Sequence, residues 1–259
     1  MKNLLMVLVV TLFIYNVNAQ EKIYLLFEFM RVDNEQEVAY METEGFWENI
    51  HKERVKNGDI IGWDLWKLQP GGEDQQYQYL TVNIYDDPVK MMNGEGDFTK
   101  ALTDAYPDMS EDVLEKIIER TGKSRDLAIK LYVEQINGTS PEYKVPLGTV
   151  ASLDMMKVEL KNYNAYEMAE NKIFKPMHQK QVNNSEKEGW ILVRIISPTG
   201  SNTYTSHMTV NMFKDYDQYF MKGAVISKPS DKETKVINNG LDLRDLKYVY
   251  LATLIKQAR

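Results

Sequence analysis

Apolar and polar residues alternate in a nine-residue stretch that occurs twice in the chain. The first copy, at 79–87, reads YLTVNIYDD, and the second, at 207–215, reads HMTVNMFKD. Alternation with a period of two is typical of a β-strand with two different faces. Four of the nine positions are identical, namely Thr81/Thr209, Val82/Val210, Asn83/Asn211 and Asp87/Asp215. This repetition indicates a tandem duplication, which decides most of what the sequence predicts about the fold.

Other landmarks repeat in the same order on both sides of this strand. Met30/Met156 and Tyr40/Tyr166 are 126 positions apart, His51/His178 and Trp63/Trp190 are 127 apart, Asn83/Asn211 are 128 apart, and Arg125/Arg244 are 119 apart. We expect these changes in spacing to fall in loops. A period above one hundred residues indicates two copies of a domain rather than a solenoid.

The first copy has the pattern of four strands and two main helices. Asp33 and Asn34 are helix-start residues, and Gly58 and Gly122 are helix stops. Short helical turns are expected at 88–106. The predicted strands are 23–32, 60–68, 76–86 and 127–136, and the predicted helices are 35–56 and the segment that follows Ser110.

The second copy repeats this order. A helix is expected at 164–183, interrupted near Pro176, and a short helix at 215–222. We expect 225–242 to be mostly loop, with a turn of helix that ends at Gly240. The predicted strands are 152–160, 190–196, 204–213 and 246–255.

The order β-α-β-β-α-β in each copy is that of the ferredoxin-like split βαβ unit. Such a unit is a four-stranded antiparallel sheet with helices on one face, and its other face has to be buried. The second copy is the obvious cover, so we predict an α+β fold in which two tandem modules form a single-chain α/β barrel. The predicted modules are 20–137 and 149–259, joined by a linker at 138–148.

This arrangement resembles the dimeric α/β-barrel superfamily, here in tandem single-chain form. The strands that begin near Trp63 and Trp190, and the hairpins that follow them, look most like those of NIPSNAP-type and antibiotic-biosynthesis-monooxygenase-type domains. The resemblance implies that helices pack outside and that the sheets enclose a cavity. It also implies two chemistries found among relatives, which are haem binding through one histidine and cofactor-independent oxygenase or isomerase-like catalysis.

The first residues have the pattern of a secretory signal peptide. Lys2 gives a positive end, residues 4–15 are nearly all apolar, and Ala19 ends a small-residue cleavage site. The apolar run is shorter than the ~20 residues of a membrane span, which disfavours a membrane anchor. We therefore expect residues 1–19 to be removed, and the mature protein to be secreted or periplasmic with no membrane span.

Composition argues against several classes of protein. The formal net charge is −7 and there is no basic stripe, so nucleic-acid binding is not expected. There is no cysteine, and a chain of this length can bury a core without disulfides. The sequence has no phosphate-binding glycine loop, metal-ligand cluster or serine-hydrolase elbow. No metal site is therefore expected, and the oligomeric state is left open.

The alternation also assigns strand residues to two faces. We expect the uniformly apolar Leu80, Val82 and Ile84 to face the helices, and the residues between them to face the cavity. The expected cavity-facing residues with binding chemistry are Glu28, Trp63, Lys67 and Asn83 in the first copy, and Asp154, Trp190, Arg194, His207 and Asn211 in the second.

Two interpretations of this set stay open. In the first, each half presents a carboxylate, an asparagine, a cation and a tryptophan to a bound small molecule, which is the mixed lining that such a site needs. In the second, Glu28 with Lys67 and Asp154 with Arg194 are satisfied ion pairs that close a filled barrel.

Two of the three histidines, His51 and His178, occupy equivalent positions near the ends of equivalent helices. One interpretation is a ligand-binding residue, a general base or a haem ligand in each half. The other is a pair of helix-end histidines, inherited by duplication, next to the C-terminal dipole of the helix. Haem is kept open as a cofactor although no haem motif is present, and no other cofactor is expected.

His207 is the asymmetric histidine, because Tyr79 stands at its position in the first copy. If one half kept a catalytic site, His207 and Asn211, with Arg194 beside them, are the better candidates. Glu28 is the candidate catalytic carboxylate of the first copy.

An Arg-Asp pair precedes the last strand of each copy, at Arg125-Asp126 and Arg244-Asp245. It is either an anion site at the cavity mouth or a surface ion pair. Taken together, the patterns predict an exported soluble protein that binds a small molecule in the barrel cavity. The alternatives are a cofactor-independent monooxygenase or isomerase-like enzyme, and a purely structural or interaction protein.

Overall fold

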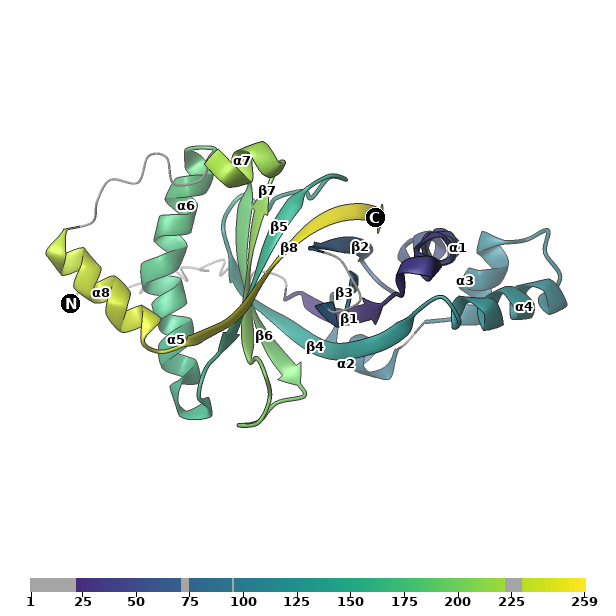
Figure 1. Ribbon diagram of the computed structural model, residues 1–259. Helices are drawn as coiled ribbons and strands as arrows, with labels where there is room; N and C mark the ends of the chain where they lie inside the picture. Colours follow the sequence, from purple (N-terminus) through teal and green to yellow (C-terminus); the bar gives the residue numbers. More distant parts are fainter. Residues whose placement is uncertain (1–21, 71–74, 95, 222–229) are drawn as a thin grey trace, which may run out of the picture.

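Eight antiparallel strands close into a barrel in the computed structural model, which describes residues 22–70, 75–94, 96–221 and 230–259 (Figure 1). The order around the barrel is β1-β3-β2-β8-β5-β7-β6-β4. The expected signal peptide at 1–19 lies outside the described residues. The strands are β1 (Tyr24–Arg31), β2 (Gly62–Gln69), β3 (Tyr79–Tyr85), β4 (Asp126–Gly138), β5 (Val150–Lys157), β6 (Gly189–Ser197), β7 (His207–Phe213) and β8 (Asp245–Ala258).

Each copy contributes four neighbouring strands, in the order β4-β1-β3-β2 for the first module and β8-β5-β7-β6 for the second. Each set comes from a β-α-β-β-α-β unit, as the sequence predicts. The modules join where β2 pairs with β8 and where β4 pairs with β6. The α+β fold class and a barrel made of two ferredoxin-like modules are therefore confirmed.

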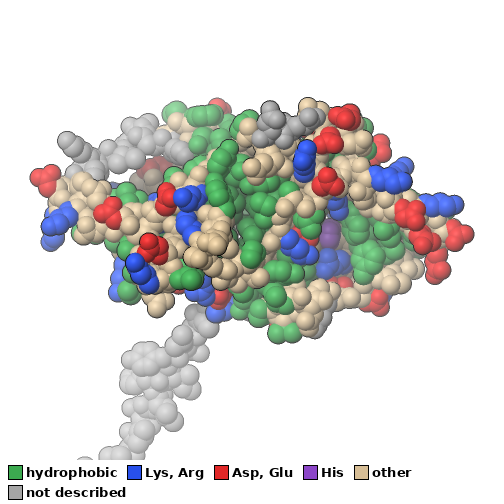
Figure 2. Space-filling model, turned by 60° about the horizontal axis from the view of Figure 1, so that its bottom comes forward, with side chains coloured by type: hydrophobic (Ala, Val, Ile, Leu, Met, Phe, Trp, Pro, Cys, Tyr) green, Lys and Arg blue, Asp and Glu red, His purple; other side chains and the backbone are tan. Residues whose placement is uncertain are grey.

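Helices cover the outside of the barrel on two opposite sides, with α1, α3 and α4 on one side and α5, α6 and α8 on the other (Figure 1). Among the described residues, no helix is long and apolar enough to cross a membrane. The helices are α1 (Glu37–Lys56), α2 (Pro88–Asn93), α3 (Phe98–Ala105), α4 (Glu111–Thr121), α5 (Tyr163–Ala169), α6 (Lys175–Asn183), α7 (Tyr216–Met221) and α8 (Asp231–Leu241). Figure 2 shows apolar side chains gathered over the middle of one face, with many charged side chains toward its two ends.

The repeated aspartates Asp87 and Asp215 start helices. The Oδ1 atom of Asp87 accepts hydrogen bonds from the backbone N–H groups of Val89 (2.6 Å) and Lys90 (3.0 Å) at the start of α2. The Oδ1 atom of Asp215 accepts from the backbone N–H of Gln218 (2.8 Å) at the start of α7. Such bonds satisfy N–H groups that lack partners within the helix. This identity within the repeat therefore has a local structural cause.

The helix α8 was not predicted, because we interpreted 225–242 as mostly loop. Its sequence includes Asn238, Asn239 and Gly240, which are poor helix formers. The helix nevertheless continues to Leu241. A Cβ atom on Gly240 would lie 2.9 Å from a ring carbon of Phe174. Gly240 thus permits close packing against the neighbouring helical segment, and this tertiary contact outweighs the low helix propensity.

A single extra residue distinguishes the two long helical segments. Tyr40 and His51 are eleven positions apart in α1, whereas Tyr166 and His178 are twelve positions apart. A π-helical turn at Glu170–Phe174 joins α5 to α6 between them. A π-turn spaces its hydrogen bonds one residue wider than an α-turn, so it absorbs the insertion. The expectation that changes in spacing fall in loops is wrong here, since this change lies inside a helix.

The two faces of each sheet are reversed relative to our expectation. Leu80 and Val82 belong to the cluster inside the barrel, and Ile84 packs against it. Tyr79 and Tyr85 instead belong to the cluster between the first sheet and α1. Both faces of the sheet are buried, so alternation alone does not tell which face meets the helices. Inside the barrel the apolar side chains pack against the largely apolar inner face of the opposite sheet, whereas the helices bring polar groups to the outer face.

Candidate functional site

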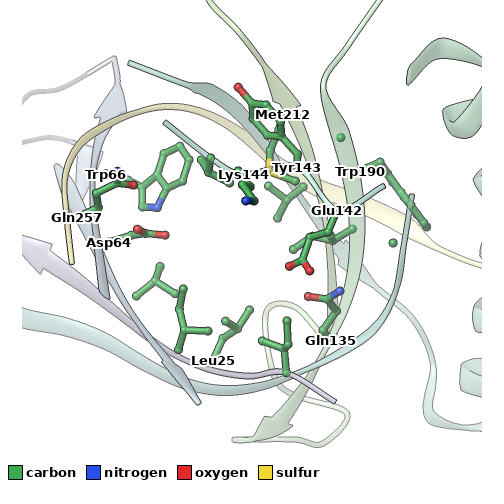
Figure 3. Close-up of a pocket in the computed structure, with 18 of the residues that line it drawn as sticks. Leu25, Asp64, Trp66, Gln135, Glu142, Tyr143, Lys144, Trp190, Met212 and Gln257 are labelled. Atoms are coloured by element: carbon green, nitrogen blue, oxygen red, sulfur yellow. The ribbon is translucent and has the colours of Figure 1, made fainter. Parts of the chain in front are cut away.

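A cavity of about 690 Å³ lies between the two sheets (Figure 3). Its wall is built from both modules, with Val82 and Val210 at equivalent positions of the repeat and Phe27 and Leu153 at another equivalent pair. Trp66 is one of the aromatic residues of the wall. The cavity thus exists as predicted, but the apolar faces of the sheets line it.

Aromatic side chains fill the barrel beyond one end of the cavity. Phe29 packs on Tyr77 with ring centroids 4.7 Å apart, and the hydroxyls of Tyr77 and Tyr250 are 2.9 Å apart. All three rings are buried in the interior cluster and none of them lines the cavity. The cavity is therefore closed on this side by packed rings.

The segment that links the two modules lies at the other end of the cavity. Residues 142–146 of this segment line the cavity, and Figure 3 shows Glu142, Tyr143 and Lys144 at its edge. A Cβ atom on Gly189 would lie 3.2 Å from the Cβ of Tyr143, and one on Gly62 would lie 2.8 Å from Nη1 of Arg259. The repeated glycines therefore allow covering groups to approach the barrel closely.

A group of polar side chains lies on the β2–β8 wall of the cavity, apart from Gln135 on β4 and from Glu142 and Lys144 of the linking segment. Asp64, only 5% exposed, forms an ion pair with Arg259, in which Nη2 donates to Oδ1 at 2.6 Å. Burial raises the pKa of the Asp64 carboxyl, while Arg259 and the Trp66 side chain act in the opposite direction. Gln257 lies beside Asp64 on the neighbouring strand β8. We did not predict this group. Asp64 is a charged residue among the otherwise apolar inward positions of β2, and this break in the pattern could have indicated a polar site.

Trp190 lines the cavity as expected and also packs on the helix side of the sheet, but the other residues that we expected in the cavity lie on the helix side alone. In the first module His51 lies flat on Trp63, with ring centroids 4.8 Å apart and ring planes 17° apart. Arg54 Nη1 is 3.3 Å from both His51 Nδ1 and Asn83 Oδ1. Burial, with the nearby charges of Arg54 and Arg125, holds the pKa of His51 well below its usual value. His51 is therefore a neutral ring, and it accepts a hydrogen bond from Arg54.

The second module has the same arrangement with a different cation. His178 lies on Trp190, with centroids 4.8 Å apart and planes 20° apart. Lys187 Nζ is 2.9 Å from His178 Nδ1 and 2.6 Å from Asn211 Oδ1. Burial and Lys187 lower the pKa of His178 to about 3. Asn211 also donates to Asp154 Oδ2 at 3.0 Å, so four of the predicted residues of this half do come together, but on the helix side of the sheet.

His207 and Arg194 meet at a residue that the sequence analysis missed. Glu167 on α5 accepts from His207 Nε2 (3.2 Å) and from Arg194 Nη1 (2.9 Å). Burial opposes ionisation of Glu167, but these two partners outweigh it and its pKa lies below the usual value. Met41 stands at this position in the first copy, so the repeat gave no signal for it. Asn211 is not part of this group, contrary to our expectation.

The Glu167 carboxylate also borders a smaller pocket of about 290 Å³ at the junction of β4 and β6. Glu134 lies there as well, and it accepts from Arg194 Nη2 (2.8 Å) and Lys22 Nζ (2.6 Å). The charged groups of this pocket are therefore paired with one another.

The two ion pairs that we expected do not form. Lys67 donates to Glu37 at 2.6 Å, and Glu28 lies 3.3 Å from the ammonium group of Lys130. Lys67 and Glu28 lie on the outer face of the first sheet, where each forms an ion pair with a side chain of a neighbouring element instead. Asp154, the partner expected for Arg194, is likewise engaged elsewhere.

The arginines before the last strands bind buried glutamates of the long helices. Arg125 contacts Glu44, which is 1% exposed, through Nη1. Burial raises the pKa of Glu44 to about 7, although Arg125 acts in the opposite direction. In the second module Arg244 Nε is 3.8 Å from Glu170 Oε1, so the equivalent pair is looser. Both expected roles, a site at the cavity mouth and a surface ion pair, are wrong.

Haem finds no histidine in the wall of the 690 Å³ cavity, because the described histidines His51, His178 and His207 all lie on the outer side of the sheets. Among the described residues, no group of three or more His, Cys, Asp or Glu side chains could hold a metal ion. The arrangement of these residues therefore does not fit a haem inside the barrel.

Neither the family models nor the curated proteins compared with this sequence match it. The fold is similar to that of a putative monooxygenase from Fusobacterium nucleatum subsp. nucleatum, with 14% identity, 92% of this chain and 94% of that chain covered, and a TM-score of 0.56. A putative monooxygenase from Lactobacillus acidophilus NCFM has 9% identity, 92% and 96% coverage and a TM-score of 0.59. An anthrone oxidase-like protein has 10% identity, 92% and 93% coverage and a TM-score of 0.53. The predicted resemblance to dimeric α/β barrels is confirmed at the level of the fold.

Proposed function

We propose that the protein binds an apolar small molecule inside the barrel. The observation that carries this proposal is the cavity of about 690 Å³, which is walled by apolar side chains of both modules. Its volume lies within the ~300–1,000 Å³ typical of small-molecule sites. The likeness in fold to putative monooxygenases also supports a protein that takes up small organic molecules.

The test is native mass spectrometry of the protein purified from its own host. We expect an additional mass that is lost on denaturation, and loss of that mass in the cavity-filling variant Val82→Trp. The matched control is Val38→Trp, because Val38 is 75% exposed on α1 and its enlargement leaves the cavity unchanged. Absorbance of the same sample tests for haem. A bare wild-type protein that also binds no apolar probe in solution would overturn the proposal and favour a structural or interaction role.

A cofactor-independent oxygenase or isomerase-like enzyme is the second candidate. The observation that favours it is Asp64, a buried carboxyl in the wall of the cavity, where it is placed to take a proton from a bound ligand, and whose pKa burial raises. Once a ligand is known, wild-type protein should convert it over time in air, and Asp64→Asn should slow that conversion at least about 100-fold. Conversion at an equal rate by both proteins would exclude Asp64 as the base.

We also propose that the protein acts outside the cytoplasm. Support comes from the signal-peptide pattern at 1–19, and N-terminal sequencing of the protein isolated from its host tests it. The mature protein should begin at Gln20.

A further inference from the structure

The polar wall of the cavity belongs to one module junction and has no equivalent at the other. Asp64 and Gln257 are cross-strand partners on β2 and β8 (Figure 3). The residue of the second copy that corresponds to Asp64 is Ile191, and its cross-strand partner on β4 is Gly138. The cavity wall therefore carries a buried carboxylate at the β2–β8 junction, whereas the position equivalent to Asp64 at the β4–β6 junction is apolar and the polar side chain of β4 in the wall is Gln135.

The charge of Asp64 is already balanced. Arg259 donates to its carboxylate at 2.6 Å, and the same guanidinium donates to the backbone carbonyls of Trp63 (3.2 Å) and Ala258 (2.9 Å). Among the described residues, the other two charged ones that line the cavity, Glu142 and Lys144, have opposite signs, so the lining as a whole carries no net charge. A ligand with a net charge would add an uncompensated charge to this mostly apolar space, which is unfavourable. The cavity is thus suited to a neutral molecule.

Gln257 is a polar side chain of this wall that lacks, within the described part of the chain, a hydrogen-bond donor for its oxygen. Its Oε1 atom is buried and has no hydrogen-bond partner among the described residues. The side chain lines the cavity, and Figure 3 shows it next to Asp64 and Trp66. A buried amide oxygen without a hydrogen-bond donor is unfavourable, so a ligand group that donates to it gains affinity.

We propose that the ligand is a neutral, apolar molecule that carries a hydroxyl group, and that this hydroxyl bonds to the amide of Gln257 while the apolar body packs between Trp66 and Val210. A hydroxyl both donates and accepts, so it matches the amide in either orientation of its oxygen and nitrogen. A charged amine or carboxylate does not meet the condition of neutrality. This proposal rests on the proposed function, since it specifies the ligand of the same cavity.

Equilibrium dialysis with three probes of similar size tests the proposal: 2-naphthol, 2-methylnaphthalene and 2-naphthoate. We expect the full mature protein to bind 2-naphthol about tenfold more tightly than 2-methylnaphthalene, as one additional hydrogen bond of about 1.4 kcal/mol provides. We expect 2-naphthoate to bind more weakly than both. Tighter binding of 2-naphthoate than of 2-naphthol would overturn the requirement for a neutral ligand.

Gln257→Leu should abolish the preference for 2-naphthol and leave the affinity for 2-methylnaphthalene within about threefold. Gln257→Met serves as a second variant if Gln257→Leu folds poorly. Gln135→Leu is the matched control, because Gln135 lines the same cavity from β4, and it should retain the preference. Loss of the preference in Gln135→Leu instead of the Gln257 variants would overturn the assignment of the hydroxyl site.

The outcomes separate this proposal from the one on which it rests. If none of the probes binds wild-type protein, both proposals fail. If 2-naphthol and 2-methylnaphthalene bind with equal affinity and Val82→Trp abolishes both, the apolar cavity stands as a binding site and the hydroxyl-specific contact is refuted.

Discussion

His178 lies flat on Trp190 with the ring centroids 4.8 Å apart. The same stack joins the equivalent histidine and tryptophan of the first module at the same distance. In each module a cation bonds to the histidine Nδ1 and to an asparagine oxygen, although Arg54 does so from α1 and Lys187 from the segment before β6. The duplication has therefore kept this geometry while the residue that supplies the cation differs.

The neutral state of His178 predicts a loss of stability in acid. Its pKa is about 3 in the folded protein and ~6.5 in an unfolded chain. Above pH 6.5 the ring is neutral in both states and contributes nothing to the pH dependence. Below pH 6.5 only the unfolded state takes up the proton, so the free energy of unfolding falls until the pH approaches 3. We expect this residue to account for about 1–2 kcal/mol of lost stability between pH 6.5 and pH 5.

Urea unfolding of wild-type protein and His178→Phe at both pH values measures this effect. Phenylalanine keeps a flat ring on Trp190 but binds no proton, so the variant should lose about 1–2 kcal/mol less than wild type on acidification. The same pH dependence in both proteins would show that His178 does not resist protonation.

The contact between Arg125 and Glu44 predicts that loss of Arg125 destabilises the fold more at high pH than at low pH. Arg125→Met leaves a buried carboxyl without its cation, and we expect a loss of about 3–5 kcal/mol at pH 8. Burial already holds the pKa of Glu44 near 7, above its ordinary value, so the folded protein takes up a proton as the pH falls. The loss should therefore be smaller at pH 5, where a protonated carboxyl needs no cation.

The control for this variant is Lys130→Met. Lys130 lies 3.3 Å from Glu28 in a more exposed ion pair, and such pairs contribute less than about 1 kcal/mol. Equal losses in both variants, or a loss in Arg125→Met that does not change with pH, would contradict the buried-pair interpretation.

The π-turn predicts that a one-residue deletion is tolerated better in the α5–α6 segment than in α1. Glu170 and His178 are eight positions apart, whereas Glu44 and His51 are seven apart in the regular helix α1. Deletion of the exposed Lys172 restores a spacing of seven, so the segment can continue as an α-helix with both side chains toward the sheet. We expect a cost of at most about 2 kcal/mol in thermal or urea unfolding.

Deletion of the exposed Asn49 is the matched control, because it shortens the Glu44–His51 spacing to six and turns His51 away from Trp63. It should cost at least about 2 kcal/mol more than the deletion of Lys172. A greater cost for the deletion of Lys172 would mean that the π-turn is needed for packing beyond the spacing of these two residues.

The capping aspartates predict a small and local effect. Asp87→Ala removes the acceptor for two backbone N–H groups of α2 and should cost about 1 kcal/mol of stability. Asp87→Asn keeps an acceptor and should cost less. Denaturant midpoints of the two variants check the order, and an equal loss in both would point to the charge of Asp87 rather than to its hydrogen bonds.

The sequence predicted the fold class well, because the repeated stretch at 79–87 and 207–215 carries both the period of a strand and the internal repeat. It did not predict which face of that strand points into the barrel and which points toward the helices. Val82 and Asn83 are both buried, one between the sheets and one beneath α1, and the alternation is the same in either orientation.

The partners of the candidate site residues were harder to predict for a different reason. Glu167, Arg54 and Lys187 occupy positions that do not match between the two copies, so the repeat gave no indication of them. They contact His207, His51 and His178 through the tertiary fold. Nothing in the sequence indicated Gln257 either, since its place in the cavity wall follows from its position opposite Asp64 on β8.

Asp64 in the first module corresponds to Ile191 in the second, and this difference has a consequence for how a bound molecule is oriented in the barrel. A barrel made of two identical chains repeats every residue across its twofold axis, so an asymmetric guest has two equivalent poses. Here both halves belong to one chain, and each half accumulates substitutions independently. A ligand that binds as proposed, with its hydroxyl on Gln257, meets the Asp64–Gln257 wall on one side of the barrel and is held in one pose, whereas a symmetric dimer would offer two such walls.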